Sequence, residues 1–248
     1  MLRIGGSDGV VELALDRPPA NALDTALSRA VAAAHRQAVA DGARAVILTG
    51  RPGMFSGGLD VPALLPLPRA AIVEFWQAFF ELNRALAASP VPVVAALSGA
   101  APAGGAVLAI HCDYRIAARG AFKIGLNEVS VGLPVPDCIM LAFEQVVGRR
   151  LAQRCAKTAQ FLTPEEALAA GLVDELAEPD ALLDRARAWT ARLLALPPAA
   201  MNRTRMRARA GLVAALQPET DARLAAEVWF SAETQAGLKA LVARLAAK

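Results

Sequence analysis

Hydrophobic and polar positions follow two alternating periods along the first fifty residues of the chain. Gly9–Asp16 alternates in the way a half-buried strand does, and Thr25–Ala40 repeats its apolar residues with helical spacing. Asp24 stands just before that helix, where its side chain can cap the first turn. Ala45–Thr49 is short and apolar, as in a buried parallel strand. The pattern therefore predicts alternating strands and helices, the signature of an α/β protein.

This alternation continues to about residue 195 and then gives way to helices alone. The next expected elements are a helix over residues 69–88, a strand over Val91–Leu97, a helix from Gly104 to His111 and a strand over Asp113–Ala117. Beyond Pro136 the periodic segments are helical: Ile139–Val147, Leu151–Thr158, Pro164–Ala170, Ala181–Leu196, and Met201 to the end. We predict an α/β core over residues 1–195 and a helical region over residues 196–248.

Composition and charge narrow the class of protein. Apolar residues make up 55% of the chain and charged residues 20%, which is typical of a globular protein. The net charge of +3 is too small to indicate a nucleic-acid partner. The cysteines are odd in number and lack CxxC spacing, and the chain begins without a signal-peptide pattern. We therefore expect a cytoplasmic protein with reduced thiols and neither disulfides nor a metal site.

One segment is long enough by count to cross a membrane. Ala85–Cys112 contains no Asp, Glu, Lys or Arg. Pro90, Pro92 and Pro102, together with pairs of glycines, would break a spanning helix. We therefore interpret the segment as a buried strand followed by a turn, and expect no membrane association.

Two glycine-rich turns and one carboxylate mark the candidate chemistry. Ser98–Gly105 follows an apolar strand, and Phe55–Asp60 is a second loop of the same kind. Small residues allow backbone N–H groups to approach a ligand, and a helix beginning at Gly104 would direct its positive end there. The segment Ile124–Glu128 adds a carboxylate. An anion site beside one carboxylate is suited to removing a proton next to a carbonyl group.

These motifs occur in an order that resembles the crotonase (enoyl-CoA hydratase/isomerase) superfamily over essentially the whole chain. The matching landmarks are Leu15–Leu23, Ala45–Gly50, Phe55–Asp60, Ser98–Gly105, Cys112–Ile116, Glu128–Val129 and Leu162–Val173. The resemblance implies a spiral of β-β-α turns, a C-terminal helical trimerisation region and hence a homotrimer or hexamer. It also implies an acyl-CoA ligand, with coenzyme A as part of the substrate and no permanently bound cofactor. Within the superfamily, the central motifs look most like the mitochondrial-type Δ3,Δ2-enoyl-CoA isomerases.

The resemblance assigns roles to particular residues. It implies that the backbone N–H groups of Leu59, just after Gly58, and of Gly104 form an oxyanion hole for the thioester, with Gly105 beside it. Glu128 occupies the position of the family's catalytic glutamate. Its apolar neighbours should raise its pKa by desolvation and suit it to exchange protons near neutrality.

One position departs from the pattern of the hydratases. They carry a second glutamate three residues beyond the oxyanion-hole glycine, and that position is Val107 here. A valine in the acyl site cannot hold water or relay a proton, so hydration is disfavoured. Asp137 is a weak candidate for a second acid, with a loop or helix-capping role as the alternative.

Other residues receive structural or peripheral roles. Arg17 is a weak choice for a contact with coenzyme A, and Asp60 is expected to stabilise the loop that presents Leu59. Asp113 is expected to pair with Arg115. His35 and His111 are interpreted as packed core residues, and the arginines near the C-terminus as mostly solvated: Arg203, Arg205, Arg207 and Arg209. Trp76, Phe79 and Phe80 can line either an acyl pocket or the core.

Three hypotheses for the function follow. The first is an isomerase that shifts the double bond of a 3-enoyl-CoA to the 2-position through Glu128. The second is an enoyl-CoA hydratase or another lyase of the superfamily, with Asp137 or a remote residue as the second acid. The third is a non-catalytic module that binds CoA esters or RNA. The sequence specifies neither acyl chain length nor pathway.

Overall fold

A six-stranded sheet forms the centre of the molecule, for which a computed structural model describes residues 1–247. Its strands lie in the order β1 (Leu2–Ser7), β2 (Val10–Leu15), β3 (Ala45–Thr49), β5 (Val93–Leu97), β7 (Tyr114–Ala118) and β9 (Glu175–Ala177). The first pair is antiparallel and the remaining pairs are parallel. Both central strands β3 and β5 are buried along their whole length, which explains why they are apolar except at Thr49, whose hydroxyl donates to the Ala96 carbonyl oxygen.

A second, three-stranded sheet gathers the segments that follow the central strands. It pairs β4 (Gly53–Met54), β6 (Gly99–Pro102) and β8 (Ile124–Gly125), all in parallel. These strands follow β3, β5 and β7, respectively, after short links. Because parallel strands end at the same edge of a sheet, the turns that leave β4, β6 and β8 meet there. This second sheet is what brings the two glycine-rich turns and Glu128 together.

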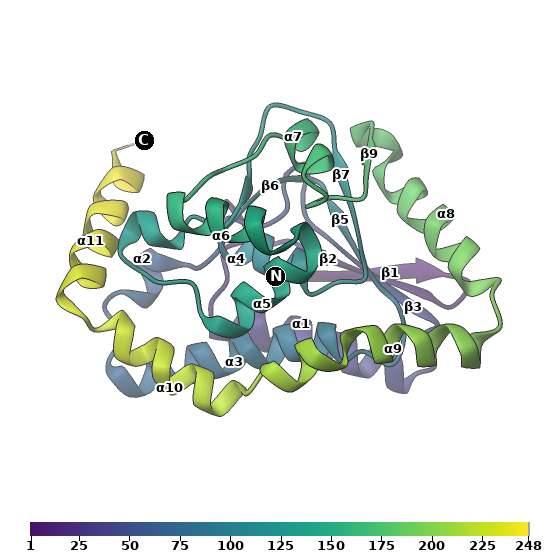
Figure 1. Cartoon of the computed structure of the whole chain (residues 1–248), viewed down its shortest axis with the longest axis horizontal. Coiled ribbons are helices and arrows are strands. Elements are labelled where there is room, and N and C mark those ends of the chain that lie inside the picture. Colours follow the sequence, from purple (N-terminus) through teal and green to yellow (C-terminus); the bar gives the residue numbers. More distant parts are fainter. Residues whose placement is uncertain (248) are drawn as a thin grey trace.

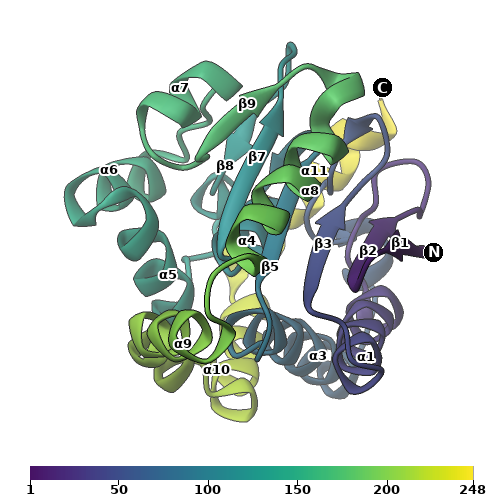
Figure 2. The ribbon, with the colours of Figure 1, turned by 90° about the vertical axis from the view of Figure 1, so that its right-hand side faces the viewer.

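Helices cover both faces of the large sheet. On one face, α1 (Thr25–Ala40) packs beside α3 (Arg69–Ala87), and α8 (Leu182–Leu194) lies across β3, β5 and β7 on the other (Figure 2). The shorter helices are α2 (Val61–Leu64), α4 (Gly104–Ile110), α5 (Asp137–Val147), α6 (Arg149–Thr158), α7 (Pro164–Ala169) and the 3-10 turns η1 (Glu128–Val131) and η2 (Pro179–Ala181).

The C-terminal helices fold back over the first half of the chain. Following the yellow-green end of the ribbon in Figure 1, α9 (Pro198–Ala215) leads into α10 (Pro218–Trp229), which packs on α3. The last helix, α11 (Ala232–Ala246), turns upward and packs on α2 and η1. Residues far apart in sequence are therefore neighbours at this end of the molecule. No helix in the described part of the chain is both long and apolar enough to cross a membrane.

The longer elements lie where the sequence predicts them. The helix over Thr25–Ala40 and the strand over Ala45–Thr49 have the expected bounds, and Asp24 caps the helix by accepting the Leu27 N–H at 2.7 Å. Other predicted ends shift by a few residues, and the C-terminal segment divides into three helices. The strands β1, β4, β6, β8 and β9 are not predicted. Most are too short to show a period, and β1 is nearly all exposed.

The expected pairing of Asp113 with Arg115 is wrong. Arg115 binds Asp174 at 2.8 Å, whereas Asp113 contacts Arg205 at 3.2 Å and Arg209 at 2.9 Å. These last two arginines were expected to be solvated, but they lie one turn apart on α9 and share the face that packs on the core. Only the packing of α9 selects these partners.

Candidate active site

The turns that leave the small sheet open into a cavity of about 400 Å³. Leu59, Gly104, Val107 and Glu128 all line it. Besides Glu128, the polar groups of the lining side chains are the Asn127 amide and the indole N–H groups of Trp76 and Trp229, and Glu128 is the one ionisable side chain there among the described residues. An enclosed apolar space with few polar groups is the usual form of a site for a small ligand.

Two backbone N–H groups lie at the junction of the glycine-rich turns. Gly58 has a positive φ of +84°, and a Cβ placed on it would lie 3.2 Å from the Gly104 nitrogen, so the two turns are in close contact. Gly104 begins α4 and its N–H lacks an acceptor within that helix. Among the described residues, neither this N–H nor that of Leu59 has a hydrogen-bond acceptor. Both are therefore free to bind a ligand oxygen.

Glu128 is held in a largely buried position at the start of η1. Glu128 is 8% exposed, and its Oε2 atom is buried without a hydrogen-bond partner in the described structure. Burial raises the pKa of Glu128 from its ordinary value to about 7, against the opposing effect of hydrogen bonds from its own backbone and that of Asn127. A carboxyl group with this pKa can both accept and return a proton near neutrality.

Val107 and Gly105 occupy different sides of α4. Val107 is almost fully buried and turns into the cavity, where it adds to the apolar wall. Gly105 lies behind the helix, because a Cβ there would come within 2.4 Å of the Ser56 carbonyl oxygen. Gly105 thus allows α4 to pack against the loop that carries Leu59, and its place beside the expected oxyanion hole stays a prediction.

Arg17 supports the loop that carries Leu59 from outside the cavity. Its guanidinium contacts Asp24 at 3.1 Å and Asp60 at 2.7 Å, and donates to the Ala22 carbonyl at 2.8 Å. Asp60 also accepts the N–H of Ala63 and so caps α2, as its expected role in stabilising the loop requires. The carboxylates balance the charge of Arg17, which disfavours it as the phosphate contact that the sequence suggested.

Asp137 lies apart from the other candidates. It is exposed at the first turn of α5 and does not line the cavity, although its neighbours Pro136 and Ile139 do. The negative charge of an acidic residue in the first turn of a helix is stabilised by the helix dipole. The geometry thus favours the structural alternative for Asp137 over a second acid.

The far wall of the cavity is aromatic and aliphatic. Trp76 and Phe79 of α3 line it, whereas Phe80 does not. Trp229 packs edge-on against Trp76, with ring centroids 6.1 Å apart. The C-terminal helix contributes Leu238, Leu241 and Leu245. The sequence prediction missed this C-terminal contribution, although the spacing of the three leucines marks one helical face.

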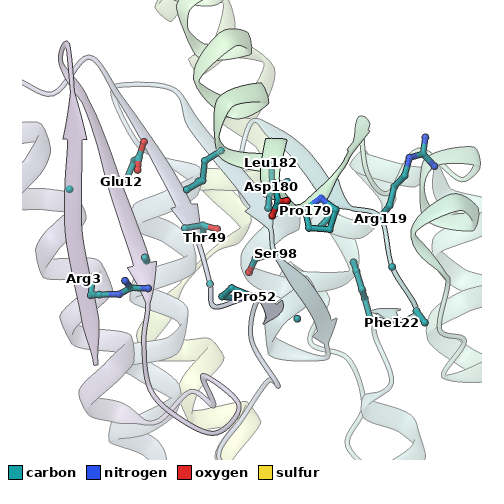
Figure 3. Close-up of a pocket in the computed structure, with 18 of the residues that line it drawn as sticks. Arg3, Glu12, Thr49, Pro52, Ser98, Arg119, Phe122, Pro179, Asp180 and Leu182 are labelled. Carbon is teal, nitrogen blue, oxygen red and sulfur yellow. The ribbon is translucent and has the colours of Figure 1, made fainter.

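A larger cavity of about 810 Å³ contains none of the candidate residues (Figure 3). Three of its charged side chains have partners: Arg3 pairs with Asp16, Glu12 with Arg187, and Arg119 with both Glu165 and Glu178. The fourth, Asp180, is exposed on η2. None of these ionisable side chains is buried, in contrast to Glu128 in the smaller cavity. Size alone does not identify the active site.

His35 and His111 are buried structural residues, as predicted. His35 Nε2 lies 3.0 Å from the Ser89 hydroxyl, and His111 Nδ1 lies 2.7 Å from the Val107 carbonyl oxygen. Burial lowers the pKa of each to about 4. Both imidazoles are therefore neutral at pH 7.

The fold and the site can now be compared with known proteins. A family model described as enoyl-CoA hydratase/isomerase matches residues 5–248. The chain belongs to the enoyl-CoA hydratase/isomerase family. This hydratase/isomerase homologue superposes on the crystal structure of human mitochondrial delta3-delta2-enoyl-CoA isomerase with a TM-score of 0.94, at 30% identity and over 98% of this chain and 97% of the human chain. The expected α/β crotonase fold, with two sheets and a C-terminal helical region, is confirmed.

Sequence relatives carry two kinds of name. The hydratase/isomerase homologue is 35% identical over 195 residues to the mitochondrial enoyl-CoA delta isomerase 1 of Rattus norvegicus, spanning 77% of this chain and 68% of the relative. It is 36% identical over 220 residues to a probable enoyl-CoA hydratase of Mycolicibacterium paratuberculosis, spanning 88% and 84%. These matches show that the chain is an enzyme of acyl-CoA metabolism, either an isomerase or a hydratase. The cytoplasmic location stays a prediction, since the rat relative is mitochondrial by name.

Proposed function

We propose that this protein is an enoyl-CoA isomerase that converts 3-enoyl-CoA into 2-enoyl-CoA. The observation that supports this most is the presence of one buried carboxyl group, Glu128, in an otherwise non-ionisable cavity beside two free N–H donors. The isomerase names of close structural and sequence relatives agree with it.

The reaction follows from the positions of these groups. The thioester oxygen accepts hydrogen bonds from the N–H groups of Leu59 and Gly104. The Glu128 carboxylate removes a proton from C2, and the electron pair delocalises onto the thioester oxygen and C4. Glu128 then returns the proton to C4, so the double bond moves from C3–C4 to C2–C3 without any change in composition. Each oxyanion donor contributes about 3–4 kcal/mol in the transition state.

Apolar surroundings favour proton return over water addition. Hydration of a 2-enoyl-CoA needs a water held and deprotonated beside the double bond, which a second carboxylate does in the hydratases that the sequence resembles. Val107 supplies a hydrocarbon surface at that position. Because some relatives are named as probable hydratases, hydration is the competing activity. A paired assay distinguishes isomerisation from hydration.

Incubation with 3-enoyl-CoA and 2-enoyl-CoA in separate reactions tests the proposal. We expect the parent protein to isomerise the first and to hydrate the second much more slowly. Glu128→Gln should lower isomerisation by at least about a hundredfold, because the amide cannot accept the C2 proton. It should still bind a saturated acyl-CoA, as measured by calorimetry. Comparable rates of hydration by the parent would contradict the isomerase proposal.

The remaining properties of the proposal concern assembly and the substrate. We propose that the protein assembles as a homotrimer or hexamer, binds acyl-CoA and holds no permanently bound cofactor. We do not propose that it is an RNA-binding module. Two of the C-terminal arginines, Arg205 and Arg209, are already engaged by Asp113 and carbonyl oxygens, which leaves fewer cations for a polyanion. Light scattering of the purified protein measures the assembly.

A further inference from the structure

The C-terminal helix touches the catalytic turn backbone to backbone. A Cβ placed on Gly237 of α11 would lie 2.2 Å from the Val131 carbonyl oxygen and 3.0 Å from the Val131 Cα. Gly132, which ends η1 with a φ of +71°, abuts α11 in turn, since a Cβ on it would lie 3.0 Å from the Glu233 carbonyl oxygen. Such close contact leaves no room for side chains between the two segments.

A chain of hydrogen bonds fastens the same contact. The Ser231 hydroxyl donates to the Thr234 hydroxyl at 2.9 Å, and Thr234 donates to the Gly132 carbonyl oxygen at 2.5 Å. Thr234 is fully buried. Its hydroxyl therefore connects the N-terminal cap of α11 directly to the end of η1, four residues beyond Glu128.

The helix that makes this contact also closes the cavity around Glu128. Leu238 follows Gly237 directly, and Leu241 and Leu245 continue the same face along α11 into the cavity wall. A shift of α11 away from η1 would therefore do two things at once. It would release the turn that bears Glu128, and it would open the apolar wall to water.

We propose that Thr234 and Gly237 are positioning residues, which clamp α11 onto η1 and so keep the Glu128 carboxyl oriented and dry. This inference rests on the proposed role of Glu128 as the base. The proton transfer would then depend on two residues near the C-terminus, which lie more than a hundred positions from Glu128 in the sequence.

No neighbouring charge offers a competing explanation for the state of Glu128. The elements packed against η1 are α11 and α6. Their charged side chains are all exposed: Glu233, Lys239 and Arg244 on α11, and Arg149, Arg150, Arg154 and Lys157 on α6. The one buried ionisable group on these helices, Cys155 of α6, is a thiol whose pKa is raised by burial, so it is neutral. Burial itself is the largest cause of the raised pKa of Glu128. Loosening the clamp should accordingly lower that pKa.

The first test compares two Gly→Ala variants in C-terminal helices. Gly237→Ala adds a methyl group that meets the Val131 backbone, so we expect kcat for 3-enoyl-CoA to fall by about tenfold or more, because small displacements of a catalytic group are costly. Gly211→Ala in α9 adds the same methyl where the nearest atom is 3.9 Å away. It should leave kcat and the pH profile unchanged.

The second test removes only the hydroxyl, in case Gly237→Ala fails to fold. Thr234→Val should lower kcat and shift the ionisation of Glu128 downwards by about one pH unit as water enters. Thr234→Ser should restore both. Thr190→Val, which removes an equally buried hydroxyl bonded within α8 at 2.8 Å, controls for general loss of stability.

The ionisation of Glu128 is measured without any reaction, by 13C NMR of glutamate carboxyl groups, with the resonance assigned through Glu128→Gln. A lower pKa in Thr234→Val and not in Thr190→Val supports the clamp even if the parent protein shows no isomerase activity, in which case only the proposed function fails. An unchanged pKa and kcat in a folded Thr234→Val or Gly237→Ala protein would overturn the clamp.

Discussion

At the scale of single residues, the proposed chemistry depends on one carboxyl group and one hydrocarbon side chain. Glu128 and Val107 face the same cavity, and the pKa of Glu128 is raised to about 7 by burial. The sequence indicates both residues through motif position alone. It also predicts the direction of the pKa shift, because the neighbours of Glu128 along the chain are apolar.

The pH dependence of isomerisation should follow the ionisation of Glu128. Only the carboxylate can remove the C2 proton, so kcat/KM for 3-enoyl-CoA should be constant above about pH 7 and fall tenfold per unit below it. Initial rates in buffers of constant ionic strength measure this profile. A profile that stays flat down to pH 5 would show that another group is the base.

Val107→Glu should create a measurable hydratase. A second carboxylate in the cavity would hold a water beside Glu128, and we expect hydration of 2-enoyl-CoA to rise by at least about tenfold over the parent. Val107→Gln serves as the matched control, because it has similar size and cannot ionise. Equal hydration by the two variants would argue against general-acid assistance from this position.

At the scale of elements, the packing around the site depends on short strands and on a set of long-range hydrogen bonds from Arg209, which we term the clasp. The helices α1 and α3 are strongly periodic and are predicted well, whereas the strands of two residues in the small sheet show no period. Arg209 illustrates the clasp: it donates to the carbonyl oxygens of Ala87 and His111, near the C-terminal ends of α3 and α4, and to Asp113. A cation suits these positions because carbonyl groups there lack helical partners.

Replacing Arg209 by leucine should destabilise the protein strongly. The change leaves buried carbonyl groups and part of Asp113 without partners, and should lower the free energy of unfolding by about 2–3 kcal/mol. Arg207→Leu, two positions away and exposed, should change it by less than about 0.5 kcal/mol. Urea denaturation of both variants measures the difference, and similar losses in the two would contradict the clasp.

At the scale of the whole molecule, three buried groups contribute to the dependence of stability on pH. The pKa values of His35 and His111 are lowered to about 4, so below pH 6.5 the unfolded chain takes up two protons that the native state refuses. The pKa of Glu128 is raised to about 7, so between pH 4.5 and 7 the native state holds one proton that the unfolded chain releases. These contributions have opposite signs.

Acidification from pH 6.5 to 5 should therefore lower the free energy of unfolding, and Glu128→Gln should make that loss steeper. The same variant should be more stable than the parent at pH 8, by up to about 3 kcal/mol, because the native state no longer buries a carboxylate. Thermal unfolding across this pH range measures both effects. A variant that is less stable than its parent at pH 8 would contradict the burial of a charged Glu128.

The sequence by itself determined the family resemblance, the long elements, the two glycine-rich turns and the identity of the candidate base. These depend on local period and on motif order, which are properties of neighbouring residues. Only the tertiary structure decided the partners of Asp113, the packing role of Gly105, the ion pairs of Arg17 and the entry of α11 into the cavity wall. Each of these depends on which surfaces meet when distant segments pack, and a local pattern does not specify that.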